Sequence, residues 1–297
     1  ASIISRALGS KQYNKAELAL GNFLSLSVII SILVTIPSLI FRTELLQLFG
    51  ATPTILPYAL DYLTILLIGT LFITIASASN HIIRSEGNAK YAMALMIVGA
   101  LVNLCLDPIF IFGFNMGMKG AALATVLGEL SACILALIYF FKGKSDVQLK
   151  FTNFKLDKKI TKETIKVGSS SLARNTSGNI IAIILNNALG FYGGDLAIAA
   201  YGIVQRLFMF VMMPLFGIVQ GMQPILGYNY GAKNFDRVKE TLKQAMKYAT
   251  IMSSLAFIIL MVFAKPLSSV FTTDIALIEM SKSFIRILTI TLPIVGF

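Results

Sequence analysis

The chain has 297 residues, of which 56% are hydrophobic and only 13% are charged, and its mean hydropathy is +0.79. A soluble domain of this composition would expose large apolar patches, so these values exclude an ordinary soluble protein and indicate a membrane protein. The net charge of +11 is also typical of nucleic-acid-binding proteins, but its distribution along the chain argues against that class.

Eight apolar stretches follow one another along the chain, and each is long enough to cross a bilayer. They run over residues 18–41, 55–83, 91–113, 119–141, 164–192, 196–227, 245–263 and 276–297. A helix of about 20 residues spans the roughly 30 Å of hydrocarbon in a membrane. Strands of a membrane β-barrel would alternate in polarity, and none of these stretches alternates. The sequence therefore predicts an all-α polytopic membrane protein.

The basic residues between the stretches alternate from one connection to the next. About 18 Lys and Arg lie in the segments 1–17, 84–90, 142–166 and 228–247. The opposite set of connections holds only Arg42, Lys119 and Lys265. The positive-inside rule then places the first set, and with it residue 1, on the cytoplasmic side of the plasma membrane. Topology explains the basic charge, with contact to the lipid bilayer as an addition, and no nucleic-acid partner is expected.

A short polar segment near the start of the chain recurs near its end. Gly9-Ser10-Lys11-Gln12-Tyr13 and Gly231-Ala232-Lys233-Asn234-Phe235 lie 222 residues apart. The same spacing, without a gap, relates Leu20 to Leu242 and Phe41 to Phe263. The two halves are therefore interpreted as copies of one ancestral unit.

The longest polar segment, residues 142–162, is interpreted as the link between an N-terminal lobe, residues 1–150, and a C-terminal lobe, residues 151–297. The repeated segment precedes the first apolar stretch in one copy and the third stretch in the other. Equal copies would need two more helices before Ala1 and two more after Phe297. The sequence thus predicts two pseudo-symmetric six-helix lobes, of which eight helices are present, in a protein of about 430 residues.

Several short motifs occur in an order that matches a known transporter family. They are Arg84-Ser85-Glu86-Gly87-Asn88, Asn103–Pro108, Gly120–Thr125, Gln220–Pro224 and Gly227–Ala232. In this ordered set, which spans essentially the whole chain, the sequence resembles the prokaryotic branch of the multidrug and toxic compound extrusion (MATE) family. The resemblance implies a twelve-helix antiporter, whose third to tenth helices correspond to the stretches seen here.

Asp107 is the most informative single side chain, because it lies near the middle of the third apolar stretch. A carboxylate at that depth costs roughly 2.5–3.5 kcal/mol on insertion scales, so it should face protein or water and have a partner. Asn103 lies one turn earlier on the same face, and Pro108 leaves the carbonyl of Leu104 without its helical donor. Such oxygen atoms suit a proton or Na⁺. The alternative is that Asp107 only hydrogen-bonds a neighbouring helix.

The resemblance adds roles to three of these positions. In prokaryotic members of the family, an Asn and an Asp on the fifth helix and a Thr on the sixth surround an essential Asp on the first helix. Asn103, Asp107 and Thr125 match the first three in type and spacing, which implies cation coupling. The first-helix Asp has no counterpart, because the sequence is expected to begin after that helix. For Thr125, close helix packing is an equally open interpretation.

Two groups of residues are expected to line a substrate cavity. Asn175 and Asn179 lie one turn apart on one face of the fifth stretch, where a polar stripe should border a water-filled path or bond another helix. Tyr201, Gln205 and Met212 lie in the sixth stretch. Aromatic and thioether groups can repack around flat hydrophobic cations, although Met212 is also an ordinary core or lipid-facing residue.

The sequence therefore predicts a monomeric multidrug antiporter that exchanges small organic cations for H⁺ or Na⁺ by alternating access, with no other cofactor and no bound metal. A lipid-linked precursor flippase of a related superfamily is the alternative, and Arg174 and Arg206 leave room for it. An enzyme is not expected, because the chain lacks an Asp-Asp-x-x-Asp motif and a nucleophile beside a base. The two copies of the repeated unit are unequal, and one buried carboxylate, Asp107, is present. These features favour a gated binding site over the continuous pore of a channel.

Overall fold

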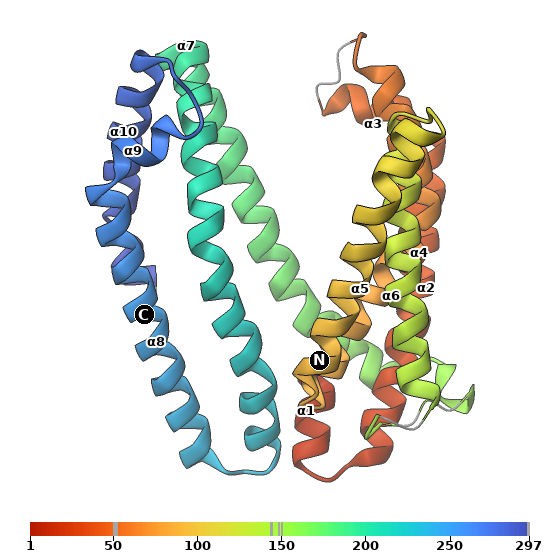
Figure 1. The fold of residues 1–297 in the computed structure, drawn as a ribbon. Coiled ribbons are helices and arrows are strands. Elements are labelled where there is room, and N and C mark those ends of the chain that lie inside the picture. Colours follow the sequence, from red (N-terminus) through yellow and green to blue (C-terminus); the bar gives the residue numbers. More distant parts are fainter. Residues whose placement is uncertain (50–52, 143–144, 148, 150, 296–297) are drawn as a thin grey trace. The chain divides into compact units, whose positions relative to one another are not determined.

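The computed structural model describes residues 1–49, 53–142, 145–147, 149 and 151–295, and every regular element in those ranges is a helix (Figure 1). The chain divides into two compact units. Unit 1 comprises Ala1–Lys162 and Gly227–Lys233, and unit 2 comprises Glu163–Leu226 and Asn234–Phe297. The polar link thus belongs to unit 1, while the boundary at residue 150 stays a prediction about the lobes.

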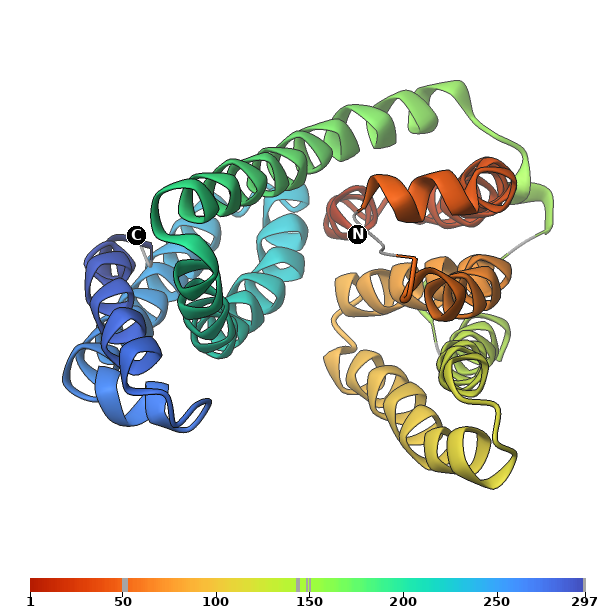
Figure 2. The same cartoon turned by 90° about the horizontal axis from the view of Figure 1, so that it is seen from above.

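Unit 1 is a bundle of long helices. Its elements are α1 (Ser2–Gly9), α2 (Tyr13–Ile40), α3 (Arg42–Leu48), α4 (Leu56–Ser85), α5 (Ala89–Pro108), the π-helix η1 (Ile109–Gly113), α6 (Met118–Phe141) and the 3₁₀ turn η2 (Phe151–Phe154). Helix α6 packs against α4 and α5, and α2 packs against α4, as the view from above shows (Figure 2). The buried core, which includes Leu20, Ile83, Leu95 and Tyr139, joins the ends of these helices nearest the link.

Unit 2 is built around one very long helical element. It contains most of α7 (Lys158–Gly231), then α8 (Phe235–Val262), α9 (Ala264–Ser269), α10 (Ile275–Thr289) and α11 (Leu292–Val295). Gly194 interrupts α7 with φ 61° and ψ −162°, a conformation that glycine adopts readily, and the chain reverses direction there (Figure 1). Ile203, Val204 and Leu207 of α7 form a hydrophobic cluster with residues of α8, α10 and α11.

The backbone repeats the duplication that the sequence predicts. Helices α2 and α8 each have 28 residues and begin 222 residues apart. The turns before them both place a lysine in the left-handed region, with φ 59° at Lys11 and at Lys233. A non-glycine residue adopts this conformation only where the surrounding turn requires it. The two turns are therefore copies of one local structure.

Among the described residues, six helical segments are long and apolar enough to cross a membrane: Tyr13–Ile40, Leu56–Ser85, Ala89–Gly113, Met118–Phe141, Leu196–Gly231 and Phe235–Val262. Their large side chains are widely exposed, as at Leu33 and Leu104, where about two thirds of the surface is accessible (65% and 67%). Such surfaces suit lipid rather than water. The chain is a polytopic helical membrane protein.

Two of the eight predicted spans are helical but do not belong to these six. Residues 164–192 form the first limb of α7, where Lys166, Arg174 and several Ser and Asn lower the hydropathy. Residues 276–297 divide into α10 and the short α11, because the regular helix stops at Thr289. The first of these stretches is therefore long enough but more polar than the six, whereas the second has no regular helix long enough to be counted.

The polar link is attached to unit 1 by the fully buried amide of Asn22 in α2. Its Nδ2 group donates to the carbonyls of Leu18 at 2.9 Å and Lys155 at 3.3 Å. Its Oδ1 atom accepts from the Asp157 amide at 2.7 Å and from the Thr161 hydroxyl at 3.3 Å. Both donors and both acceptor positions of the amide are therefore used, which fixes the beginning of α7.

Asn22→Ala is expected to lower the free energy of unfolding by about 1–3 kcal/mol, because it leaves buried backbone groups of the link without partners. Limited trypsin digestion of the intact protein should then cleave after Lys155 faster than in the unchanged protein. Asn14→Ala, at an exposed position of the same helix, is the matched control. Equal cleavage rates in the two variants would contradict the attachment.

Glu86, between α4 and α5, makes a second attachment to the link. Its carboxylate accepts hydrogen bonds from the hydroxyls of Tyr139 at 2.9 Å and Ser145 at 2.7 Å. Burial raises the pKa of Glu86 to about 7, and the nearby Asp146 carboxylate adds to the rise, while the two hydrogen bonds oppose it. The folded protein therefore holds a proton at Glu86 to a higher pH than the unfolded chain does.

Stability is expected to fall as the pH rises from about 4.5 to about 7, because the folded state then loses its advantage in binding the Glu86 proton. The largest loss is about 3 kcal/mol. Thermal unfolding in detergent between pH 5 and pH 8 measures it. Glu86→Gln should flatten this pH dependence of stability. Glu44→Gln, at an exposed site, is the control and should leave the pH dependence unchanged. If the slope were also unchanged in Glu86→Gln, the Glu86 carboxyl would be excluded as the source of the pH dependence.

Candidate functional site

The site predicted around Asp107 lies between two positions where α6 packs closely, one against α5 and one against η1. A Cβ atom on Gly128 of α6 would lie 2.6 Å from the carbonyl oxygen of Gly99 in α5 and 3.2 Å from the Cβ atom of Asn103. A Cβ atom on Gly120 would lie within 2.9 Å of the Phe110 backbone. Only hydrogen fits at these two positions, so glycine allows the two backbones to come together.

This close approach brings Asn103 and Thr125 into contact across the two helices. The Asn103 Nδ2 group donates to the Thr125 hydroxyl oxygen at 3.4 Å. The Thr125 hydroxyl in turn donates to the Ala121 carbonyl one turn earlier, at 2.9 Å. Because the Thr125 proton is directed along its own helix, its oxygen is free to accept the amide. The amide oxygen of Asn103 is not engaged by Thr125.

Asp107 lies one turn after Asn103 and is half-buried. Its Oδ1 atom is shielded from solvent and has no hydrogen-bond partner in the part of the chain that the structure describes. Within those residues, no hydrogen bond joins it to Asn103 or Thr125. A buried carboxylate oxygen of this kind requires a proton, a cation or a donor from another segment.

The helix changes type directly after Asp107. Regular α-helix ends at Pro108, and the chain continues as the π-helix Ile109–Gly113 before α6 begins. Proline supplies no amide hydrogen, and π-helical turns are frequent at functional sites because they leave backbone carbonyls poorly paired. The carboxylate therefore lies at a transition in the backbone, as the Asp-Pro pair predicts.

Comparison with known proteins decides the family. The family model described as MatE matches residues 1–109 and 171–297, which is most of the chain. The chain belongs to the MatE family. The resemblance inferred from the ordered motifs is confirmed.

Curated relatives and solved structures agree with this assignment. The chain is 27% identical over 293 residues to the multidrug export protein MepA of Staphylococcus aureus and 26% identical to MepA of Staphylococcus haemolyticus, covering 99% of the chain and 64% of each relative. A crystal structure of MATE in the bent conformation matches with a TM-score of 0.93 at 27% identity, over 99% of this chain and 65% of that one. A multidrug resistance MATE family transporter in the outward-facing conformation matches with a TM-score of 0.92 at 27% identity, over 99% of this chain and 66% of that one. The chain thus spans about two thirds of the length of these relatives.

The described part of this MatE chain does not test whether the predicted substrate residues form one site. In α7, the Gln205 side-chain amide donates to the Tyr201 hydroxyl at 2.5 Å, on an exposed part of the helix. Met212 packs against the hydrophobic cluster of unit 2. Asn175 is exposed, and the side chain of Asn179 lies outside the described part of the chain. The substrate cavity stays a prediction.

Sequence reasoning missed Gly128, which sets the distance between α5 and α6. Its signal was the position three residues after Thr125, where a small residue can face the partner helix. It also missed Asn22 and Glu86, whose hydrogen bonds attach the link. A polar residue within an apolar stretch was the available signal for Asn22, because such a side chain needs a specific partner.

Proposed function

We propose that the protein exports small organic cations across the plasma membrane in exchange for H⁺ or Na⁺, as a monomer that opens alternately to either side. The observation that carries the proposal is the shielded Oδ1 atom of Asp107, which has no partner among the described residues, one turn from the Asn103–Thr125 contact in a MatE chain. The similar MepA proteins are described as multidrug export proteins. Residue 1 lies on the cytoplasmic side in this proposal.

Coupling follows if the ion and the organic cation favour different conformations of the same protein. A ligand shifts a conformational equilibrium only by the difference in its affinity for the two states. A proton or Na⁺ at Asp107 would neutralise a charge that is costly between α5 and α6. Release of that ion restores the charge, so occupancy of the site changes the relative stability of the two conformations.

The proposal is tested in everted membrane vesicles containing the intact protein, where the cytoplasmic face is outside and export appears as ethidium uptake into the lumen. The proton gradient and the sodium gradient are collapsed separately, each with its own ionophore. Export should stop when one of the two gradients is removed and continue when only the other is removed. Export that persists without either gradient would exclude ion-coupled antiport.

A lipid-linked precursor flippase, the alternative that the sequence left open, would require a basic groove facing lipid. Arg206 is exposed on α7, whereas the side chain of Arg174 lies outside the described part of the chain. No observation on these residues favours that function over export of cations. Failure of ethidium export together with gradient-independent movement of a lipid-linked precursor would reverse this order.

A further inference from the structure

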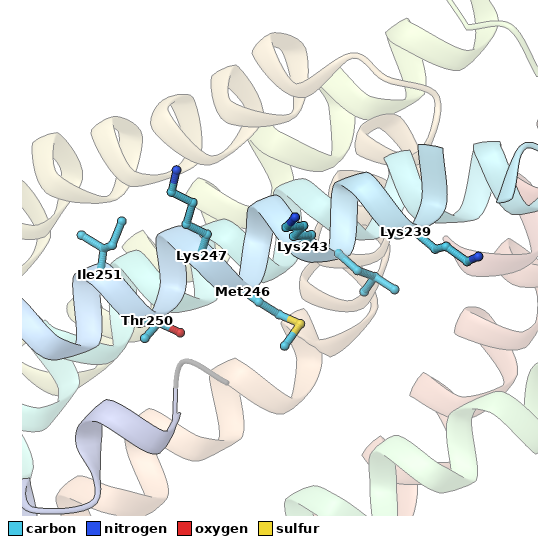
Figure 3. Close-up of a pocket in the computed structure, with 7 residues that line it drawn as sticks. Lys239, Lys243, Met246, Lys247, Thr250 and Ile251 are labelled. Atoms are coloured by element: carbon cyan, nitrogen blue, oxygen red, sulfur yellow. The ribbon is translucent and has the colours of Figure 1, made fainter. Parts of the chain in front are cut away.

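Helix α8 carries a groove on one face of its first half, with a volume of about 660 Å³. It is lined by Lys239, Leu242, Lys243, Met246, Lys247, Thr250 and Ile251. Figure 3 labels all of these except Leu242 and shows them following one another along the helix. The three lysines are spaced four residues apart, so they lie on one face with Leu242 and Met246 beside them. Cationic groups and an apolar floor thus occur in the same groove.

The three lysines have no anionic partner in the part of the chain that the structure describes. By contrast, Lys265 and Lys282, which also lie in the second half of the chain, each form an ion pair with Glu279. Like charges four residues apart on a helix destabilise it, by about 0.2–0.5 kcal/mol for each pair. Asp236 and Glu240 precede Lys239 and Lys243 by three residues on the same helix, but no ion pair joins them to these lysines in the described residues, so the row of cations still attracts an external anion.

The internal duplication shows how the same face is used in the other copy. Residues 222 positions earlier on α2 are Glu17, Gly21 and Ser25 in place of the three lysines. There the link covers the face: the Ser25 hydroxyl donates to the Phe154 carbonyl at 2.7 Å, and Gly21 packs directly against the backbone of Asn153. A Cβ atom on Gly21 would clash with that backbone. The first copy therefore covers this face with protein only because glycine stands there.

Lys243 occupies the position that corresponds to Gly21. A lysine side chain leaves no room for a chain segment packed as closely as the link is packed on α2. The apolar residues are retained, as Leu20 and Leu24 correspond to Leu242 and Met246. Lysines stand at the positions of Gly21 and Ser25, which contact the link in the first copy, and at the position of Glu17. The groove of α8 therefore requires an occupant that is anionic at one end and apolar at the other.

We propose that this groove binds an anionic phospholipid of the cytoplasmic leaflet. The headgroup phosphate lies among Lys239, Lys243 and Lys247, and an acyl chain lies along Met246 and Ile251. The basic segment 228–247 is on the cytoplasmic side under the proposed topology, where anionic lipids attract basic residues. Lysine stems also cover apolar surface while their ammonium groups reach phosphate. Each lysine near such a surface strengthens binding by about fivefold, so three together give roughly a hundredfold preference at most.

The test uses tryptophan fluorescence, since the chain itself contains no tryptophan. Met246→Trp is made in the intact protein and reconstituted in phosphatidylcholine nanodiscs. Phosphatidylglycerol or phosphatidylcholine with brominated acyl chains is then added in matched concentration series, and quenching is compared. Half-maximal quenching should need a concentration of brominated phosphatidylglycerol at least about tenfold lower than that of brominated phosphatidylcholine. If this variant does not fold, Leu242→Trp places the probe on the same face.

Three comparisons make the result specific. The first adds a triple substitution in the groove, Lys239→Gln, Lys243→Gln and Lys247→Gln, which should remove the preference for phosphatidylglycerol. The second removes the same charge elsewhere, by Lys158→Gln, Lys159→Gln and Lys162→Gln, and should retain that preference. Ile258→Trp, an exposed site further along α8, should be quenched equally by both lipids.

Equal quenching at position 246 would overturn the proposal, and so would an equal loss in both glutamine triples, which would indicate general surface charge. Quenching by neither lipid would show that protein covers the groove, which also overturns it. None of these outcomes bears on ion-coupled export.

Discussion

Asp107→Asn is expected to reduce gradient-driven ethidium export by roughly tenfold or more, while the protein still inserts and accumulates in the membrane. Asparagine keeps the shape of the side chain but cannot be ionised, so it can neither take up a proton nor attract Na⁺. The Oδ1 atom of Asp107 is shielded and unpartnered in the described chain, and the substitution removes its charge without breaking a recorded hydrogen bond. Initial export rates from energised cells, normalised to the amount of protein, measure the effect.

Asp61→Asn is the matched control for that experiment. Asp61 pairs with Lys119 at 3.5 Å, and both side chains are about half exposed (45% and 55%). An exposed pair of this kind contributes about 0–1 kcal/mol, so its loss should leave export within about twofold. Undiminished export by Asp107→Asn, with the control also active, would remove Asp107 from the coupling site.

Gly128→Ala is expected to destabilise the protein more than any other glycine-to-alanine substitution at the site. The added carbon would lie 2.6 Å from the Gly99 carbonyl oxygen, so α5 and α6 would have to separate. Overpacking of this kind costs about 1–3 kcal/mol. The separation should also lengthen the Asn103–Thr125 contact, which is already 3.4 Å, and export should fall together with the midpoint of thermal unfolding.

Gly168→Ala distinguishes this steric effect from a general effect of alanine. Gly168 lies in α7, where an added Cβ atom meets nothing within 4 Å. Alanine is favoured over glycine in a helix by about 0.5–1 kcal/mol, so this variant should be as stable as the unchanged protein or more stable. If Gly128→Ala were equally stable, the close packing of α5 and α6 would not depend on glycine.

Much of the fold could be predicted from the sequence because hydropathy and duplication are properties of the chain itself. The length of an apolar run predicts a helix, and the spacing of 222 residues predicts a duplication, with which the equal φ values of 59° at Lys11 and Lys233 agree. Asn103 and Asp107 lie on one face by helical periodicity alone. These predictions required no knowledge of which helices touch.

Contacts between helices could not be predicted, because they depend on pairing in three dimensions. The sequence can mark Gly128 and Asn22 as residues that face a partner, but it does not indicate that the partners are Gly99 and Asp157. The resemblance assigned Thr125 beside Asn103, and the structure places them in contact, yet the partner of Asp107 is not among the described residues. Roles in coupling and substrate binding therefore stay predictions, although the positions of most of these residues are now described.

The most direct test measures ion movement while the organic cation is exported. The intact protein is reconstituted in vesicles that hold a pH-sensitive or a Na⁺-sensitive dye, and an outward ethidium gradient is imposed. The unchanged protein should move one of the two ions in the opposite direction, and Asp107→Asn should bind ethidium but move neither ion. Equal ion movement by Asp107→Asn and the unchanged protein would contradict the assignment of coupling to this carboxylate.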